Sequence, residues 1–250
     1  MAVPENHIVS NLIFCGKFHI SGIVVAAAHD LPEMRSNDSY MMFGISSPDF
    51  WKNTRIEAFL SKVPDDRMII LDLNSEQQPL WEQTNSYFGK PFIWCLLHNF
   101  GGTRGIYGNL TRIATGPIDA MNTPGSSMIG VGITPEAIEH NPVVYDLMVG
   151  AVLGTSCSKG FTQCVISSNP QGEMSWRSEK VEDVMLWLDG YATRRYGNWT
   201  ENVHEAWRLL LEGAYQYHSD GSLKALVDRA PELSMESDLR FNPGNIAEAW

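Results

Sequence analysis

Residues 68–73 read MIILDL and residues 92–97 read FIWCLL. Both are short, continuous apolar runs, which are typical of strands buried on both faces of a parallel sheet. A third run, MIGVGI at residues 128–133, has the same character, and its glycines indicate close approach of the backbone. Segments with helical spacing separate the runs. Strands that alternate with helices predict βαβ units, and therefore an α/β fold around a parallel sheet.

The expected helices follow from apolar spacing and from residues that favour helix ends. Ser47-Pro48-Asp49 predicts the start of a helix whose apolar stripe runs from Ile56 to Val63. Further helices are expected over Leu80–Phe88, through Leu110 and Ile113, from Thr134-Pro135-Glu136 through Met148, from Ser178-Glu179 through Leu188, and from Val203 to Ala214. Residues 1–38 and the Ser/Cys/Gly-rich residues 149–171 do not follow this alternation.

The composition excludes several classes of function. Of the 250 residues, 44% are hydrophobic and 19% are charged, as in an ordinary globular protein. The net charge of −11 argues against a nucleic-acid partner, because such partners need a basic surface. No stretch reaches the roughly 18 apolar residues of a membrane span. The apolar run Ile20–Ala28 lacks the charged lead-in of a convincing signal peptide.

Cysteines and glycosylation sequons give weaker signals. Four cysteines are too few for a disulfide scaffold, and Cys95, inside an apolar run, is expected to be a buried thiol. Asn37, Asn109 and Asn198 each begin an N-glycosylation sequon, so these three residues are the glycosylation candidates. Sequons mildly favour a secretory route.

Candidate site residues follow the predicted strands, because the chemistry of parallel α/β barrels lies at the carboxyl ends of their strands. The first strand is followed by Asp72, Leu73 and Glu76, the second by His98, Asn99 and Phe100, and the third by Glu136. Carboxylates, amides, an imidazole and an aromatic ring suit glycoside hydrolysis. Each has a plainer interpretation. Asp72 and Glu76 can be carboxylates on a solvated rim, which we favour for Glu76, and we favour a structural, hydrogen-bonded role for His98.

A thiol nucleophile or a zinc pair formed by Cys95 and His98 is disfavoured. Residues three apart in a strand face opposite sides of the sheet, so their side chains do not meet. We find no metal-ligand cluster of convincing spacing and no nucleotide fingerprint, and therefore expect no metal and no cofactor. Taken alone, the residues predict an α/β enzyme with a carbohydrate-like site.

Longer motifs make the resemblance specific. The chain resembles glycoside hydrolase family 89, the α-N-acetylglucosaminidases, in Leu71-Asp72-Leu73, Gln78-Pro79-Leu80-Trp81, the block Pro91–Gly102, Gly130-Val131-Gly132, Pro135-Glu136, Asn141–Tyr145 and Arg194-Arg195-Tyr196-Gly197. The resemblance implies the C-terminal half of a (β/α)8 TIM barrel that runs into an all-helical domain. We expect an unmatched segment at 1–38, barrel at 39–218 with an atypical insertion at 149–171, and the start of the helical domain at 219–250.

The resemblance also implies a reaction, a substrate and a location. The family removes terminal α-linked N-acetylglucosamine from glycans with retention, and heparan sulfate is the animal substrate class. Glu136 matches the nucleophile, Leu73 and Phe100 match residues that line the sugar pocket, and His98 and Asn99 would support that strand end as part of the substrate-binding set. A lysosomal or secreted location follows from the family. The sequence leaves a homo-oligomer open.

Two departures favour an alternative, a non-catalytic or carbohydrate-binding remnant. The acid/base glutamate of the family lies in an Asn-Glu pair, and no such dipeptide occurs in this sequence. A pocket tryptophan expected just before Phe43 is Met41 or Met42. Deleting 149–171 joins Met148 to Gly172 and restores a continuous match, so we hypothesise that this segment, with 1–38, is translated intron or a gene-structure error.

Overall fold

A computed structural model describes residues 52–98, 105–134, 140–153, 180–217 and 242–250. It also describes the backbone of six short strands within residues 12–42 and 155–166. The chain forms two compact units, and each is described by itself. Unit 1 comprises residues 1–97 and 119–136, and unit 2 comprises residues 98–118 and 137–250.

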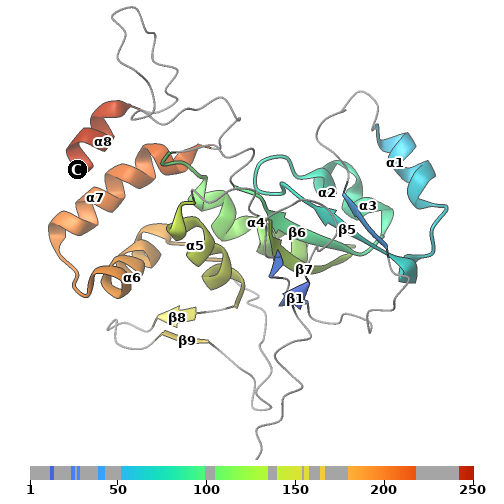
Figure 1. Cartoon of the computed structure of the whole chain (residues 1–250), viewed down its shortest axis with the longest axis horizontal. Coiled ribbons are helices and arrows are strands. Elements are labelled where there is room, and N and C mark those ends of the chain that lie inside the picture. Colours follow the sequence, from blue (N-terminus) through green and yellow to red (C-terminus); the bar gives the residue numbers. More distant parts are fainter. Residues whose placement is uncertain are drawn as a thin grey trace, which may run out of the picture. The chain divides into compact units, whose positions relative to one another are not determined.

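Unit 1 is built on a five-stranded sheet in the order β3-β7-β6-β5-β4. Its strands are β3 (Ala27–Ala28), β4 (Ser39–Met42), β5 (Met68–Asp72), β6 (Phe92–Leu96) and β7 (Met128–Ile133). β4, β5, β6 and β7 pair in parallel, each with the next in sequence. β3 is antiparallel to β7. Figure 1 shows β5, β6 and β7 side by side. The parallel sheet confirms the predicted α/β fold.

The core of unit 1 lies on both faces of its central strands. All five residues of β5 and all five of β6 are buried, and Trp94 and Phe92 have no exposed surface. Apolar side chains on both faces of a strand require cover on both faces, which parallel strands obtain from the segments that cross over between them. The runs MIILDL and FIWCLL are therefore correctly predicted as buried strands, each shorter by one residue than its apolar run.

Two helix predictions in unit 1 need correction. Residues 47–49, the predicted helix start, lie outside the described residues. Helix α1 covers Asn53–Leu60 and begins only after Lys52, whose backbone is extended with φ −80° and ψ 154°. The expected helix at 80–88 is two short pieces, α2 (Leu80–Gln83) and α3 (Asn85–Phe88). All four residues of α3 have φ between 48° and 58°, the left-handed region, so a right-handed helix cannot pass through them.

Smaller elements complete unit 1. A 3-10 turn, η1 (Asp65–Arg67), leads into β5, and buried Lys90 bonds through Nζ to the carboxylate of Asp65 and the carbonyl of Val63. Strands β1 (Leu12–Ile13) and β2 (Val24–Val25) form an antiparallel pair.

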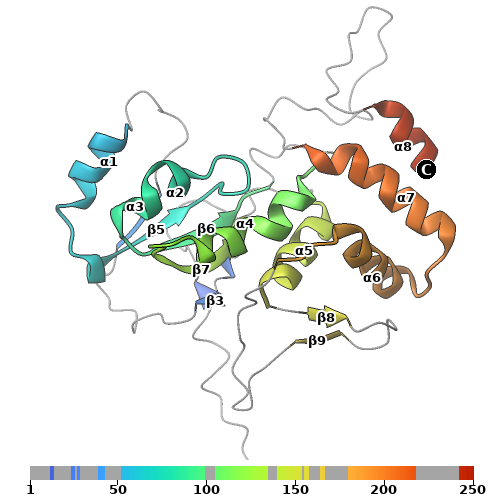
Figure 2. The ribbon, with the colours of Figure 1, turned by 180° about the vertical axis from the view of Figure 1, so that it is seen from behind.

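Unit 2 is mainly helical. It contains most of α4 (Leu110–Asn122), with α5 (Pro142–Leu153), α6 (Val184–Tyr196), α7 (Glu201–Glu212), η2 (Ala214–Gln216) and α8 (Pro243–Ala249). Figure 2 shows α8 alongside α7. Strands β8 (Thr155–Cys157) and β9 (Cys164–Ile166) form a hairpin within the segment 149–171, with Cys157 opposite Cys164 in register. None of the helices in the described part of the chain is long and apolar enough to cross a membrane.

The predicted helices of unit 2 are present, but the one expected to open at Thr134-Pro135-Glu136 begins only at Pro142, because His140 and Asn141 are not helical. The starts of α6 and α7 have side-chain caps. The Asp183 carboxylate accepts a hydrogen bond from the Leu186 N–H, so α6 begins after Val181 rather than before it. The Thr200 hydroxyl accepts one from the Val203 N–H at the start of α7. These bonds satisfy N–H groups that have no partner inside the helix. His204 of α7 bonds through Nδ1 to the buried carboxylate of Asp189 of α6, at 2.8 Å.

The two-sided burial of β5 yields a prediction about stability. Ile70 has no exposed surface, so Ile70→Ala leaves a cavity and is expected to reduce the free energy of unfolding by about 2–5 kcal/mol. Urea unfolding followed by tryptophan fluorescence measures this change. Glu57→Ala on the exposed face of α1 is the control, with an expected change within about 0.5 kcal/mol. A loss at Ile70 no larger than the control's would contradict burial on both faces.

Candidate active site

Polar residues lie at the carboxyl edge of the sheet in unit 1. Because β5, β6 and β7 are parallel, their carboxyl ends meet at one edge. Asp72, Ser75, Glu76 and Thr134 follow or end these strands, and between 0% and 4% of each is exposed. Buried polar groups need hydrogen-bond partners, and the partners of these four define the geometry of the edge.

Backbone groups of neighbouring strands are joined there. The Ser75 N–H donates to the Cys95 carbonyl at 3.0 Å, and the Thr134 N–H donates to the Leu96 carbonyl at 2.9 Å. The Thr134 hydroxyl lies 3.4 Å from the Leu73 carbonyl. Leu73, a predicted sugar-pocket residue, therefore lies beside Thr134. In the sequence, Thr134 comes two residues before Glu136. Glu136 itself lies outside the described residues, as do Asn99, Phe100 and Asn37.

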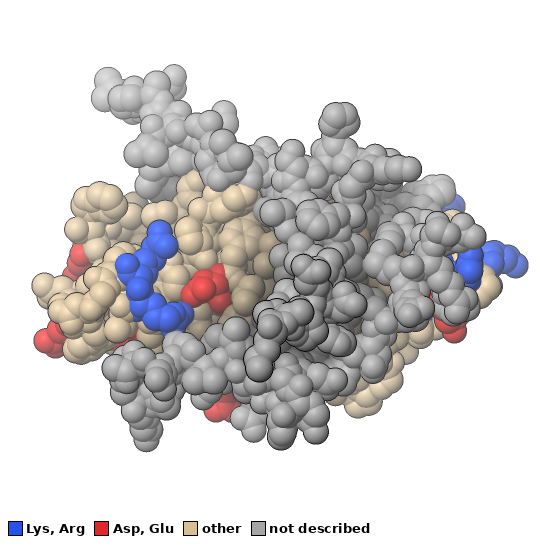
Figure 3. All heavy atoms as spheres, turned by 60° about the horizontal axis from the view of Figure 1, so that its bottom comes forward, with Lys and Arg blue, Asp and Glu red and all other residues tan. Residues whose placement is uncertain are grey.

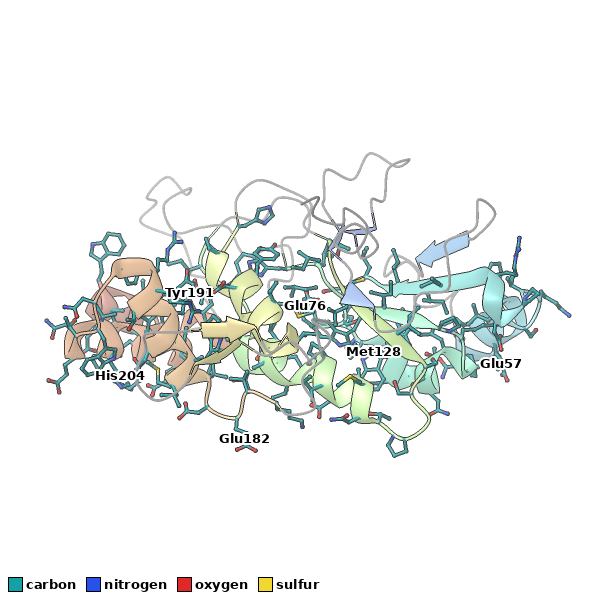
Figure 4. All side chains as sticks on the ribbon, turned by 90° about the horizontal axis from the view of Figure 1, so that it is seen from below. Glu57, Glu76, Met128, Glu182, Tyr191 and His204 are labelled. Atoms are coloured by element: carbon teal, nitrogen blue, oxygen red, sulfur yellow. The ribbon has the colours of Figure 1, made fainter. Side chains whose placement is uncertain are left out.

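Glu76 is not on a solvated rim, and that interpretation is wrong. Only 4% of the residue is exposed, and its Oε1 accepts a hydrogen bond from the Leu97 N–H at 3.1 Å. Figure 4 shows Glu76 within the fold, whereas Glu57 and Glu182 project outward. The carboxylate satisfies the backbone group just beyond β6, and such charge-assisted bonds are stronger than neutral ones. Glu76 thus ties the segment after β5 to the end of β6.

Asp72 is likewise buried rather than solvated. Its Oδ2 accepts a hydrogen bond from the Trp81 N–H at 2.9 Å, so it caps the start of α2. Burial raises the pKa of its carboxyl group to about 6, although the N–H groups of Trp81 and Leu80 favour the ionised form and act in the opposite direction. A strand-end carboxylate with this pKa resembles a catalytic acid, but its contacts assign it to the link between β5 and α2.

His98 belongs to unit 2 and is held on several sides. Only 7% of the residue is exposed, and its Nε2 lies 3.1 Å from the Nδ2 of Asn141. Its ring stacks on Tyr107 with centroids 4.5 Å apart, and the Tyr107 hydroxyl donates to the His98 carbonyl at 3.2 Å. These contacts agree with the hydrogen-bonded structural histidine that we favoured. The sequence analysis included Asn141 in the motif Asn141–Tyr145 but did not predict its contact with His98, which lies 43 residues away.

Cys95 is a fully buried thiol that takes part in no disulfide, as predicted. Its Sγ lies 3.6 Å from the Ile93 carbonyl in its own strand. Within the described part of the chain, no three His, Cys, Asp or Glu side chains group as metal ligands.

The two described sequons differ in their surroundings. The Asn109 side chain is partly buried, and its Oδ1 accepts from the Arg112 N–H at 2.8 Å at the start of α4. Asn198 is exposed between α6 and α7. Both remain predicted glycosylation sites.

A pocket of about 730 Å³ lies between α5 and α6, and none of the predicted site residues lines it. It is lined by Pro142, Tyr145, Asp146, Val149, Tyr191, Arg194 and Arg195. The Arg194 guanidinium is paired with Asp146 at 3.0 Å and lies over the Trp187 ring at 5.7 Å. Figure 3 shows basic and acidic side chains close together on one face of the molecule. This pairing offsets part of the positive charge around the pocket.

Two family profiles match the sequence. The first is described as the alpha-N-acetylglucosaminidase (NAGLU) tim-barrel domain and covers residues 16–153. The second is the alpha-N-acetylglucosaminidase (NAGLU) C-terminal domain and covers residues 187–250. The barrel match begins within the segment 1–38, and the C-terminal match begins before residue 219, where the sequence analysis places the helical domain.

Known proteins give the same picture. The chain is 37% identical over 206 residues to human alpha-N-acetylglucosaminidase, covering 81% of this chain and 25% of the human protein. A family 89 glycoside hydrolase from Clostridium perfringens, in complex with 2-acetamido-1,2-dideoxynojirimycin, matches with a TM-score of 0.60 and 25% identity over 84% of this chain and 21% of that one.

A double glutamate-to-glutamine variant of a family 89 enzyme from the same organism, in complex with its substrate GlcNAc-α-1,4-galactose, matches with a TM-score of 0.61 and 25% identity. It covers 86% of this chain and 22% of that one. The chain thus spans about a quarter of the length of the human protein it matches.

The buried carboxyl of Asp72 predicts a pH dependence of stability. Its pKa is about 6 in the folded chain against 3.8 for the ordinary group, so between these pH values the folded chain retains a proton that the unfolded chain has lost. Stability from this group is fully present below pH 4 and is lost as the pH rises through 6, by roughly 3 kcal/mol. Asp72→Asn, which keeps an oxygen to cap α2, should remove this dependence.

Unfolding free energies of wild type and Asp72→Asn at pH 4, 5, 6 and 7 test this expectation. The wild type should lose stability relative to the variant across that range, whereas Glu57→Gln on the exposed face of α1 should run parallel to wild type. A constant difference between wild type and Asp72→Asn would show that the carboxyl group ionises normally.

Proposed function

Because the chain belongs to the α-N-acetylglucosaminidase family, we propose that it forms the nucleophile-bearing part of a retaining α-N-acetylglucosaminidase site. The chain is the C-terminal part of a (β/α)8 barrel that runs into a helical domain. One observation carries the proposal. Thr134 directly follows β7 at the carboxyl edge of the parallel sheet, and Pro135-Glu136 comes next in the sequence. A carboxylate at that edge lies where barrel enzymes carry out their chemistry.

Each proposed residue has a distinct role. Glu136 acts as the nucleophile, and its carboxylate forms a covalent glycosyl ester at the anomeric carbon as the leaving oxygen departs. Leu73 and Phe100 contact the sugar. Asn99 and His98 belong to the same binding set, with His98 supporting the strand end rather than donating to substrate through Nε2. The ligand is a glycan with a terminal α-linked N-acetylglucosamine, and heparan sulfate is the proposed natural class. The names of the human and clostridial relatives support a ligand with terminal α-linked N-acetylglucosamine, and heparan sulfate rests on the family resemblance alone.

A retaining enzyme needs a second carboxyl group as its acid/base, and in the family a glutamate in an Asn-Glu pair supplies it. Without an Asn-Glu pair, these 250 residues lack the matching acid/base glutamate. General acid catalysis contributes roughly 10²–10⁴-fold to such reactions. This absence supports the second candidate function, a sugar-binding remnant without turnover. The two candidates share a pocket and differ only in whether Glu136 reacts.

A lysosomal or secreted glycoprotein is the proposed setting. The family resemblance and the exposed sequon at Asn198 support it.

A fluorinated N-acetylglucosaminyl fluoride separates the two candidates. Fluoride leaves without protonation, so the reagent needs a nucleophile but no acid. The Glu136 carboxylate attacks the anomeric carbon, the carbon–fluorine bond breaks, and the ring fluorine slows hydrolysis of the ester. We expect a mass increase on the peptide that contains Glu136, and none in Glu136→Gln.

Binding and turnover complete the test. The chain is expected to bind 2-acetamido-1,2-dideoxynojirimycin by calorimetry and to show no hydrolysis of a 4-methylumbelliferyl α-N-acetylglucosaminide. Binding without labelling would favour the remnant. A folded chain that neither binds nor labels would contradict both candidates, and measurable turnover would contradict the proposed loss of the acid.

A further inference from the structure

The corner that joins α6 to α7 in unit 2 carries a sequon between two helix caps. Helix α6 ends at Tyr196, and Gly197 follows with φ +80° and donates its N–H to a carbonyl of the last helical turn at 2.9 Å. Glycine adopts this left-handed conformation without strain, which makes it a common residue at the end of a helix. The Thr200 hydroxyl then caps the start of α7. Asn198 and Trp199 lie between the two caps, so the backbone of the sequon is held at both ends.

A contact between the two helices fixes this corner further. His204 of α7 bonds through Nδ1 to the Asp189 carboxylate of α6 at 2.8 Å. The Trp199 ring lies 6.1 Å from the His204 ring, measured between centroids, and is tilted by 57° to it. A group that is attached to a preorganised backbone loses less conformational entropy when it becomes ordered. The corner is therefore suited to hold an attached group in one position.

Two aromatic rings that flank Asn198 in the sequence are open to solvent. Tyr196 is 57% exposed and Trp199 is 44% exposed, whereas Trp187 and Trp207 of the same two helices are buried. Asn198 is exposed as well. A single exposed ring needs no explanation, but two rings on either side of one exposed residue indicate a surface that makes a contact.

The same sequence pattern occurs at a second sequon, where the ring is buried. Residues 107–111 read YGNLT and residues 196–200 read YGNWT, so both have a tyrosine two residues before the sequon asparagine. Tyr107 is only 3% exposed, because its ring stacks on His98 with centroids 4.5 Å apart. Of the two patterns, only the second leaves an aromatic face open near its asparagine. The first therefore provides a matched comparison within the same unit.

We propose that Asn198 carries an N-linked glycan whose first N-acetylglucosamine packs on the ring of Tyr196. N-linked glycans begin with this sugar, and the C–H groups on one face of a sugar are attracted to the negative face of an aromatic ring. The proposal rests on the proposed secretory setting, because sequons receive glycans along that route. It gives the exposed tyrosine a function, which is to order the glycan and thereby to stabilise the end of α6.

Tyr196 suits this contact better than Trp199. It lies two residues from Asn198, so their Cα atoms are at most about 7 Å apart, and a sugar ring on the asparagine amide nitrogen reaches the tyrosine. Less of Trp199 is exposed, and its ring already neighbours that of His204. Tyr196 therefore offers the larger free aromatic surface, and it does so at a helix end that the Gly197 cap fixes.

The experiment uses the full chain, expressed behind an added signal peptide in cells that make only high-mannose glycans. The added signal supplies the secretory route, so the result does not depend on the natural location. Endoglycosidase H then trims each glycan to a single N-acetylglucosamine. Three quantities are measured: occupancy of Asn198 by peptide mass spectrometry, the proton shifts of the ¹³C-labelled sugar, and the melting temperature. Asn198→Gln removes the glycan, Tyr196→Ala removes the proposed ring, and Trp199→Ala, which removes the ring on the other side, is the matched control.

We expect Asn198 to be occupied and the protons of its sugar to be shifted upfield by the tyrosine ring. Any sugar on Asn109 should show no such shift, because Tyr107 is buried. The trimmed glycoprotein should melt about 2–4 °C above Asn198→Gln, the shift that one contact of this kind produces in a chain of this size. This difference should vanish when Tyr196→Ala is present in both proteins and should persist when Trp199→Ala is present in both.

Each outcome decides a separate claim. An unoccupied Asn198 in the secreted chain would overturn the modification site. Unshifted sugar signals, or a glycan effect on melting that survives Tyr196→Ala, would overturn the contact with the ring. The sugar shifts of the wild type decide this point even where Tyr196→Ala does not fold. A chain isolated from its source without any glycan would contradict the secretory setting, whereas the chain with the added signal peptide still decides whether the site and the contact exist.

Discussion

At the carboxyl edge of a parallel sheet, the backbone groups just past each strand lose their neighbours and must find partners where water is excluded. A buried N–H or carbonyl without a partner destabilises the fold by about 1–3 kcal/mol. In this chain the Ser75 N–H donates to the Cys95 carbonyl, and the Thr134 N–H donates to the Leu96 carbonyl. The Leu97 N–H donates to the Glu76 carboxylate. The polar residues at this edge therefore form hydrogen bonds with backbone groups of the neighbouring strands. The proposed sugar pocket depends on that edge, because Leu73 and the segment that leads to Glu136 extend from it.

The main elements of the fold were predictable because burial on both faces of a strand leaves a direct trace in sequence. MIILDL and FIWCLL contain no polar residue before their last turn towards the edge, and short apolar runs of this length between turn residues favour a covered strand over a buried helix. Helices α6 and α7 were predicted from their apolar stripes, whereas their caps, Asp183 and Thr200, were not. The segment Leu80–Phe88 has the composition of a helix, yet the left-handed backbone of Asn85–Phe88 divides it. Local propensity does not reveal that conformation, which the surrounding packing determines.

The site was less predictable, because the role of each polar residue depends on a partner distant in sequence. From the sequence we favoured a solvated position for Glu76. In the structure its carboxylate accepts a hydrogen bond from the Leu97 N–H, 21 residues away. Asp72 has the elevated pKa expected of an acid, but its contact with the Trp81 N–H makes it a cap. The contacts of His98 with Asn141 and Tyr107 agree with a structural, hydrogen-bonded role. Asn141 entered the sequence analysis only as part of the motif Asn141–Tyr145, and its contact with His98 was not predicted. The sequence thus predicted polar residues at the ends of the strands, and the structure shows that Asp72 and Glu76 among them bond to backbone N–H groups of the fold.

The edge of β7 that faces away from β6 pairs with a strand that differs from those of a regular barrel. Every neighbour of a strand in a (β/α)8 barrel is parallel to it. β7 has the parallel strand β6 on one side, but on the other it pairs antiparallel with β3, through Ala27 opposite Val131 and Ala28 opposite Gly130. An antiparallel partner is not the barrel's own next strand, yet it covers part of the edge that a half barrel otherwise leaves open. β7 therefore keeps partners on both sides without a closed barrel, and Thr134 stays bonded to Leu96 at its end. The strand that leads to the proposed nucleophile is thus paired along both of its edges in this chain.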